Sequence, residues 1–177
     1  MGKRLNFWPL AGFLTVSALG TLAHFAYEWS GKQLLAGAFC AVNESTWEHM
    51  KLLFFPALLF TMIQIAAARE RDGAIPAVRA VSITAGLLLI PVLYYTYTGI
   101  LGRHVLWADI AIFYLAAALT FRLDSCLRRR RRLWEPWQQA AGLLWLWGLA
   151  FLFVWWTFRP PHIGLFLDPA TGGYGIA

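Results

Sequence analysis

The chain has 177 residues, of which 59% are hydrophobic, 16% aromatic and only 14% charged. Soluble domains carry about a quarter charged residues, so this composition excludes an ordinary soluble domain. Five apolar stretches are each long enough to cross roughly 30 Å of hydrocarbon, which takes about 20 helical residues. They are Phe7–Trp29, Thr46–Ala68, Ala80–Leu101, Val105–Leu123 and Trp137–Phe158. The sequence therefore predicts one all-α, multi-pass transmembrane domain over residues 1–177.

The net charge of +6 is distributed unevenly along the chain. Eleven of the fifteen lysines and arginines fall at helix ends that share one predicted side of the membrane. They are Lys3, Arg4, Arg69, Arg71, Arg79, Arg122 and Arg128–Arg132. The positive-inside rule makes that side cytoplasmic, with the N-terminus inside and the C-terminal tail outside. The run of five arginines then meets anionic membrane lipid, and we expect no nucleic-acid partner.

The first predicted helix runs outward and carries His24 and Glu28 on one face, because positions four apart share a face. The apolar run within residues 31–42 is too short to span, which predicts an interfacial or re-entrant segment on the outer side. The second helix begins where Ser45 and Glu48 match the spacing of a capping box. Lys51, one turn further on, needs an acidic partner from the same region.

Residues 80–101 and 105–123 predict two antiparallel helices joined by a short outer turn around His104. Asp109 lies near the outer end of the second of these helices, where a carboxylate is costly and usually has a partner or a pathway role. Asp124, four residues before Arg128, predicts a solvated ion pair. The last helix runs outward, and the tail 159–177 combines proline and glycine turns with apolar residues. We expect this tail to fold back over the outer mouth of the bundle.

With this topology all four histidines and five of the nine carboxylates lie on the outer side. Imidazole nitrogens and carboxylate oxygens are ligands that suit zinc and related divalent metals. Two or three histidines with one carboxylate would leave an open position at which the metal activates water. The candidate metal ligands are His24, His49, His162, Glu44 and Asp168, and the candidate catalytic residues are Glu28, Ser45, Glu48 and Asp109. In this hypothesis Glu28 or Glu48 is the general base, Asp109 orients a histidine, and the substrate is lipid-like.

No spacing in the chain is a strong metal or nucleophile signature. Each candidate also has a structural explanation, such as a helix cap for Ser45 or plain solvation for His162. Two other functions therefore stay open. One is a non-catalytic scaffold or partner-binding protein whose polar network fixes helix register. The other is a small transporter, against which the clustering of the carboxylates at one end of the helices argues.

The stretch from Asn43 to Pro56 reads NESTWEHMKLLFFP, and it resembles the signature of an uncharacterised family of small bacterial membrane proteins. The ending from Pro160 to Ile176, PPHIGLFLDPATGGYGI, is similar to that family's ending. The resemblance implies a multi-pass protein of the bacterial inner membrane, and it brings no known activity. A more distant likeness is to alkaline-ceramidase-like membrane hydrolases, which use zinc-binding histidines with a serine and an aspartate. The chain departs from them in having about five helices rather than seven and in lacking paired histidines on the last helix.

Overall fold

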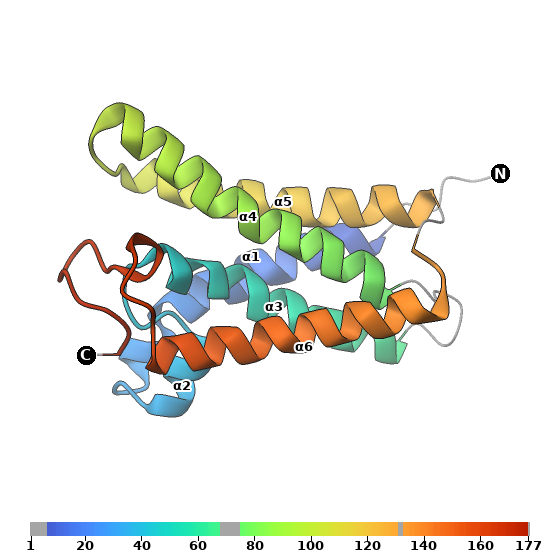
Figure 1. The fold of residues 1–177 in the computed structure, drawn as a ribbon. Helices are drawn as coiled ribbons and strands as arrows, with labels where there is room; N and C mark the ends of the chain where they lie inside the picture. The colour runs from blue at the N-terminus through green and yellow to red at the C-terminus, as the bar shows by residue number, and fades with distance from the viewer. Residues whose placement is uncertain (1–6, 68–74, 131–132, 177) are drawn as a thin grey trace.

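A computed structural model describes residues 7–67, 75–130 and 133–176 of the chain. Over these residues it contains six α-helices, one short 3-10 helix and no β-strand (Figure 1). They are α1 (Phe7–Trp29), α2 (Leu34–Phe39), α3 (Thr46–Ala67), α4 (Ile75–Leu101), α5 (Leu106–Arg129), α6 (Pro136–Phe158) and η1 (Gly164–Phe166). All α-helices except α2 are long and apolar enough to cross a membrane. The prediction of an all-α bundle with five such helices is confirmed.

The five long helices alternate in direction, so every second connection lies at the same end of the bundle (Figure 1). One end, on the left in Figure 1, holds α2, the α4–α5 turn and the tail that follows α6. We call it the histidine end, because it carries His24, His49, His104 and His162. The opposite end is the arginine end, and its described cations are Arg79, Arg122 and Arg128–Arg130.

Two of the described helix boundaries differ from the sequence-based expectation by more than one residue. Helix α4 begins at Ile75 rather than at Ala80, because Pro76 in the first turn needs no backbone N–H. Helix α5 continues to Arg129 and so includes Asp124, which is only 2% exposed and therefore not solvated. Some of the predicted features lie outside the described residues. They are the expected end of the second helix at Ala68 and the cations Lys3, Arg4, Arg69, Arg71, Arg131 and Arg132.

Helix α3 forms the centre of the bundle. In the most apolar 18-residue stretch of α3, 61% of the residues are buried, compared with 22% in the corresponding stretch of α1 and 28% in that of α6. It contacts α1, α4 and α6, and its Leu53, Phe54 and Ala57 are completely buried. The first turn of α3 is therefore fixed on several sides, which gives the polar residues there a rigid support.

The tail after α6 packs on the histidine end of the bundle. Phe166 is 3% exposed and packs between Trp47 and Trp156, with ring centroids 4.8 Å and 5.6 Å away. Asn43 donates a hydrogen bond of 2.9 Å from its side-chain amide to the carbonyl of Gly175. The tail thus holds the loop that leads into α3.

The arginine end contains a buried ionic cluster that joins α3, α4 and α5. Arg79 is 1% exposed and donates to the side-chain oxygen of Gln64 at 2.6 Å, and one nitrogen lies 3.6 Å from Asp124. Arg128 donates two further hydrogen bonds to the Asp124 carboxylate. This cluster lies at the end of the bundle opposite to all four histidines.

Candidate functional site

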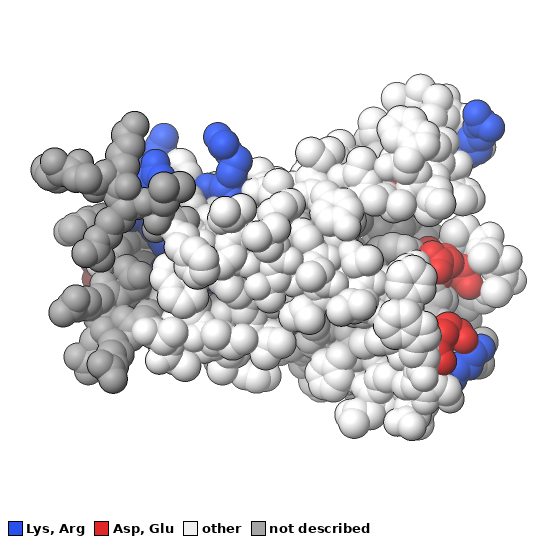
Figure 2. Space-filling view, turned by 180° about the vertical axis from the view of Figure 1, so that it is seen from behind, with Lys and Arg blue, Asp and Glu red and all other residues white. Residues whose placement is uncertain are grey.

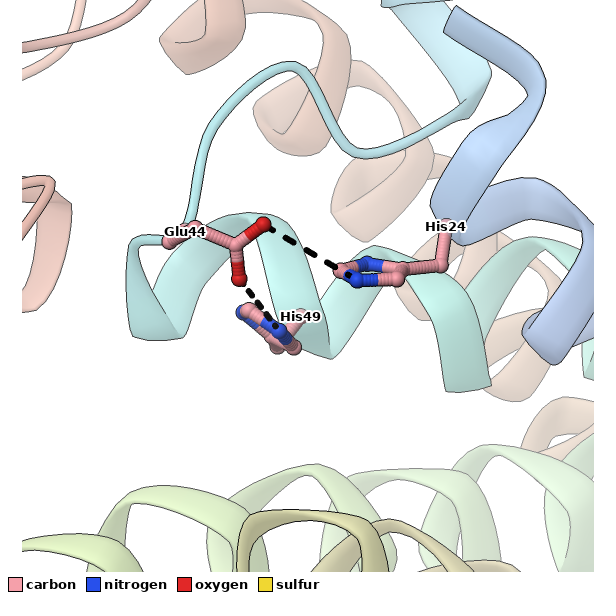
Figure 3. Close-up of side chains that lie close together, drawn as sticks. All are labelled: His24, Glu44 and His49. Atoms are coloured by element: carbon pink, nitrogen blue, oxygen red, sulfur yellow. Dashed lines mark ion pairs between the residues drawn. The ribbon is translucent and has the colours of Figure 1, made fainter. Parts of the chain in front are cut away.

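Three residues from three segments meet at the histidine end: His24 of α1, Glu44 of the loop before α3, and His49 of α3 (Figure 3). The Glu44 carboxylate points one oxygen toward each imidazole. Nε2 of His24 is 3.8 Å from Oε1, and Nε2 of His49 is 3.4 Å from Oε2. One potential ligand atom from each residue lies within 4.8 Å of the others. We call these three residues the His–Glu–His cluster.

A close approach of α1 to α3 brings the two histidines together. Gly20 lies one helical turn before His24, and a Cβ there would be 2.5 Å from the carbonyl oxygen of Leu52. Only glycine leaves room for this contact, in keeping with the small residues that allow helices in lipid to approach closely. As a result the His24 and His49 ring centroids are 5.3 Å apart.

The loop before α3 holds Glu44 between the two rings. Asn43 accepts a hydrogen bond of 2.9 Å from the backbone N–H of Ser45, which closes a short turn around Glu44. The same asparagine bonds to Gly175 of the tail, so both sides of the turn are fixed. The side chain of Glu44 remains 53% exposed, whereas both histidines are partly buried.

The hydrogen bonding of His49 determines which of its nitrogens is free. Nδ1 lies 3.0 Å from the carbonyl oxygen of Ser45, which can only accept, so Nδ1 carries the proton of the neutral ring. The lone pair of Nε2 then faces the Glu44 carboxylate at 3.4 Å. Two acceptors at this distance repel each other unless a cation or a second proton lies between them.

The cluster lies on the wall of a cavity of about 600 Å³. The apolar wall is formed by Phe25, Leu52, Ile90, Leu106, Ile110, Ile112 and Phe113. Thr21, Thr46, Tyr94 and Tyr114 add hydroxyl groups, and Pro169 and Ala170 of the tail also reach it. Figure 2 shows a hollow at this end of the molecule with acidic side chains, in red, beside it. Pockets of this volume and character accept one drug-sized ligand.

Exposed side chains of α1 and α5 form part of the cavity wall. Phe25 of α1 and Leu106 and Ile110 of α5 line it and are also 47%, 71% and 49% exposed. These side chains would contact lipid tails if the helices span a bilayer. A hydrogen bond of 3.2 Å between the hydroxyls of Thr21 and Tyr114 joins α1 and α5 at the same cavity wall.

A second polar group, formed by Asp109 and His104, lies on the α4–α5 side of the cavity. The hydroxyl of Tyr97 donates to Oδ1 of Asp109 and accepts from the backbone N–H of Val105 at 3.1 Å. Oδ2 of Asp109 is 3.6 Å from Nδ1 of His104. Asp109 is therefore held by the hairpin turn, and its carboxylate shares the cavity with the His–Glu–His cluster.

Glu48 lies in a buried ion pair rather than on the cavity wall. Its Oε2 is 2.6 Å from Nζ of Lys51, and the two side chains are 2% and 0% exposed. The carboxylate also accepts from the Val42 N–H at 3.1 Å and from the Thr157 hydroxyl at 3.2 Å. The expected capping box is therefore only half formed: Ser45 accepts from the Glu48 N–H, while the Glu48 side chain bonds elsewhere.

The remaining candidates are separate from the cluster. Glu28 is exposed and pairs with Lys32 at 3.6 Å, one turn further along the chain. The ring of His162 stacks on Tyr174 of the tail, with centroids 4.5 Å apart. Asp168 accepts from the Ala170 N–H and the Thr171 hydroxyl, and so shapes the tail turn that reaches the cavity. The structure thus joins three candidates directly and places Asp109 on the same cavity.

Two participants did not emerge from the sequence. The first is Tyr97, whose hydroxyl positions the carboxylate of Asp109. In the sequence, this contact was indicated only by the shortness of the predicted turn between the two helices that carry these residues. The second is Thr157, whose hydroxyl links the Glu48–Lys51 pair to α6. Nothing in the sequence around Thr157 signals a partner on α3.

Comparisons with known proteins give a family and nothing more specific. No curated protein and no solved structure matches the chain. A family model described as a family of unknown function, DUF6512, matches residues 2–176. That match takes in the His–Glu–His cluster, the cavity and the tail. The chain therefore belongs to the family of unknown function DUF6512.

Proposed function

We propose that the His–Glu–His cluster binds one divalent transition-metal ion, in the first place zinc, and that the bound metal hydrolyses a lipid-like substrate in the adjoining cavity. The observation that carries this proposal is the arrangement of two imidazoles around one carboxylate, with the free Nε2 of His49 facing an oxygen of Glu44. A cation between these atoms removes the repulsion between the acceptors and uses all three as ligands.

The distances in the cluster fit such an ion. Ligands at 2.0–2.1 Å from a tetrahedral zinc lie roughly 3.3 Å from one another. The two imidazole–carboxylate distances, to different oxygens of Glu44, are 3.8 Å and 3.4 Å, and one potential ligand atom from each residue lies within 4.8 Å of the others. Rotations of the His24 and Glu44 side chains would bring these atoms to the shorter separations that a tetrahedral ion needs. The hydrogen bond from Nδ1 of His49 to the Ser45 carbonyl is the kind of outer contact that orients a metal-binding histidine.

Two histidines and one carboxylate are the ligand set of several catalytic zinc sites, which keep a fourth position for water. A zinc ion held there would supply hydroxide at neutral pH, because it would lower the pKa of its bound water toward 7. Hydrolysis of an ester or amide in the cavity would then join the water oxygen to the carbonyl carbon and break the bond to the leaving oxygen or nitrogen. The proton lost by the water would pass to the leaving group. Asp109 and His104, on the same cavity, are the residues that would hold and deliver it.

We further propose an orientation for the protein, based on the distribution of its positive charges. The described arginine end carries Arg79, Arg122 and Arg128–Arg130, which supports a cytoplasmic position for that end. The histidine end and its cavity then face the outer side of a bacterial cytoplasmic membrane. The exposed side chains of α1 and α5 on the cavity wall would then lie at the level of the outer leaflet, from which we expect an amphiphile to enter.

Hydrolysis is tested with the purified full chain and a panel of single-chain esters and amides that share one acyl chain. We expect zinc-dependent release of fatty acid, measured by mass spectrometry, and its loss with a chelator. His49→Ala should lower the rate at least about 100-fold, since it removes a ligand of the metal that activates water. His162→Ala is the matched control and should retain activity. Release that survives both the chelator and His49→Ala would refute metal-dependent hydrolysis, and zinc binding without any release would leave a structural site joining α1 to α3.

A further inference from the structure

We infer that the substrate of this cavity carries no negative charge on its headgroup. The inference rests on the proposed function for the reaction, but it concerns recognition and can be measured without catalysis. It follows from the acidic side chains that line the cavity and from the absence of lysine and arginine among its described lining residues.

Among the described residues that line the cavity, the acidic groups are Glu44 and Asp109, and there is no lysine or arginine. The nearest cation along α3, Lys51, is fully buried and committed to Glu48, Thr157 and the carbonyl of Gly37. Proteins bind phosphate headgroups with arginine forks or lysine ammonium groups. This cavity offers neither.

A metal ion does not reverse this conclusion. A divalent cation with one carboxylate ligand leaves a single net positive charge at the cluster. The negative charge of Asp109 in the same cavity offsets that positive charge. A neutral substrate therefore leaves the net charge of the metal, Glu44 and Asp109 at zero. A phosphate would instead add an unbalanced negative charge in a partly desolvated space, where charges interact more strongly than in water.

The polar groups of the cavity suit an uncharged headgroup. Thr21, Thr46, Tyr94 and Tyr114 line the cavity, and each hydroxyl can donate or accept a hydrogen bond. Next to them, the apolar wall that includes Phe25 and Ile110 accommodates a hydrocarbon chain. A single-chain amphiphile with a hydroxyl-bearing or amide headgroup uses both surfaces at once.

The test compares 1-O-hexadecylglycerol with its 3-phosphate, two ether lipids that resist hydrolysis and differ in one anionic group. Binding to the full chain in neutral detergent is measured by native mass spectrometry, with and without zinc. We expect the neutral ether to bind at least about tenfold more tightly in the metal-free protein, which corresponds to about 1.4 kcal/mol. Ile110→Trp, which fills the cavity, should abolish this binding, while Leu115→Trp on the exposed face of α5 should not.

The charge argument has its own variant. Asp109→Asn should narrow the preference for the neutral ether, whereas Glu28→Gln, an exposed carboxylate of the histidine end that does not line the cavity, should leave it unchanged. Equal or tighter binding of the phosphate, or equal effects of the two substitutions, would overturn the inference. Selective binding without hydrolysis would refute only the proposed reaction. Hydrolysis with a preference for anionic substrates would refute only the inferred headgroup.

Discussion

Lys51→Met should lower the free energy of unfolding by roughly 3–5 kcal/mol, since it leaves a buried carboxylate without its partner. In the native protein Nζ of Lys51 is 2.6 Å from Glu48 and also donates to the Gly37 carbonyl and the Thr157 hydroxyl, both at 2.8 Å. These bonds join the loop segment containing α2 to α3 and α6. The change is measured by reversible unfolding in mixed detergent micelles, followed by helix content.

The exposed pair of Glu28 and Lys32 provides the matched control. Lys32→Met should cost at most about 1 kcal/mol, because exposed ion pairs contribute little. The double variant Glu48→Gln, Lys51→Met should recover part of the loss, since it no longer buries an uncompensated charge. Equal stability losses in Lys51→Met and Lys32→Met would show that the buried pair does not hold this end of the bundle.

Glu44→Gln should weaken zinc binding by more than the roughly 10- to 100-fold loss that substitutions of outer-shell partners cause. The reason is that, among the residues that the structure describes, Glu44 alone places a carboxylate between the two imidazoles, and its oxygens lie 3.8 Å and 3.4 Å from them. The amide keeps the shape of the side chain and removes its charge. Zinc affinity is measured by competition with a chelating dye in detergent solution.

Glu28→Gln controls for a general loss of negative charge at the histidine end. Glu28 lies one turn after His24 on the same helix, but its carboxylate pairs with Lys32 in the exposed part of the surface. We therefore expect wild-type zinc affinity for this variant. Zinc affinities that fall equally in the two variants would contradict a direct role of Glu44 as a ligand.

The architecture was predictable from the sequence because membrane helices need long apolar runs. Such runs can be recognised without knowing how the helices pack against one another. The helix ends were less predictable. The third apolar stretch suggested a helix that begins at Ala80, yet proline is compatible with a first helical turn, and α4 begins at Ile75 and includes Pro76. Asp124 and Arg128 suggested a surface pair, yet the extension of α5 beside Arg79 buries the aspartate.

The candidate site was predictable in its chemistry and less so in its pairing. Helical spacing suggested Glu28 as the partner of His24, but Glu44 lies against that histidine instead. The pairing depends on the path of residues 30–45 and on the close contact at Gly20, neither of which local spacing determines. His49 and Glu44 are neighbours in the NESTWEH stretch, so their proximity followed from the sequence itself.

The most direct test of the metal site is the metal content of the protein as purified in detergent, measured by inductively coupled plasma mass spectrometry. We predict about one zinc-like ion per wild-type chain, in line with the stoichiometry of a three-residue site. His24→Ala and His49→Ala should lose this metal, while His104→Ala, whose ring lies with Asp109 rather than with the cluster, should retain it. Wild-type protein that holds no metal even after zinc is added, or cluster variants that hold as much metal as His104→Ala, would contradict the account.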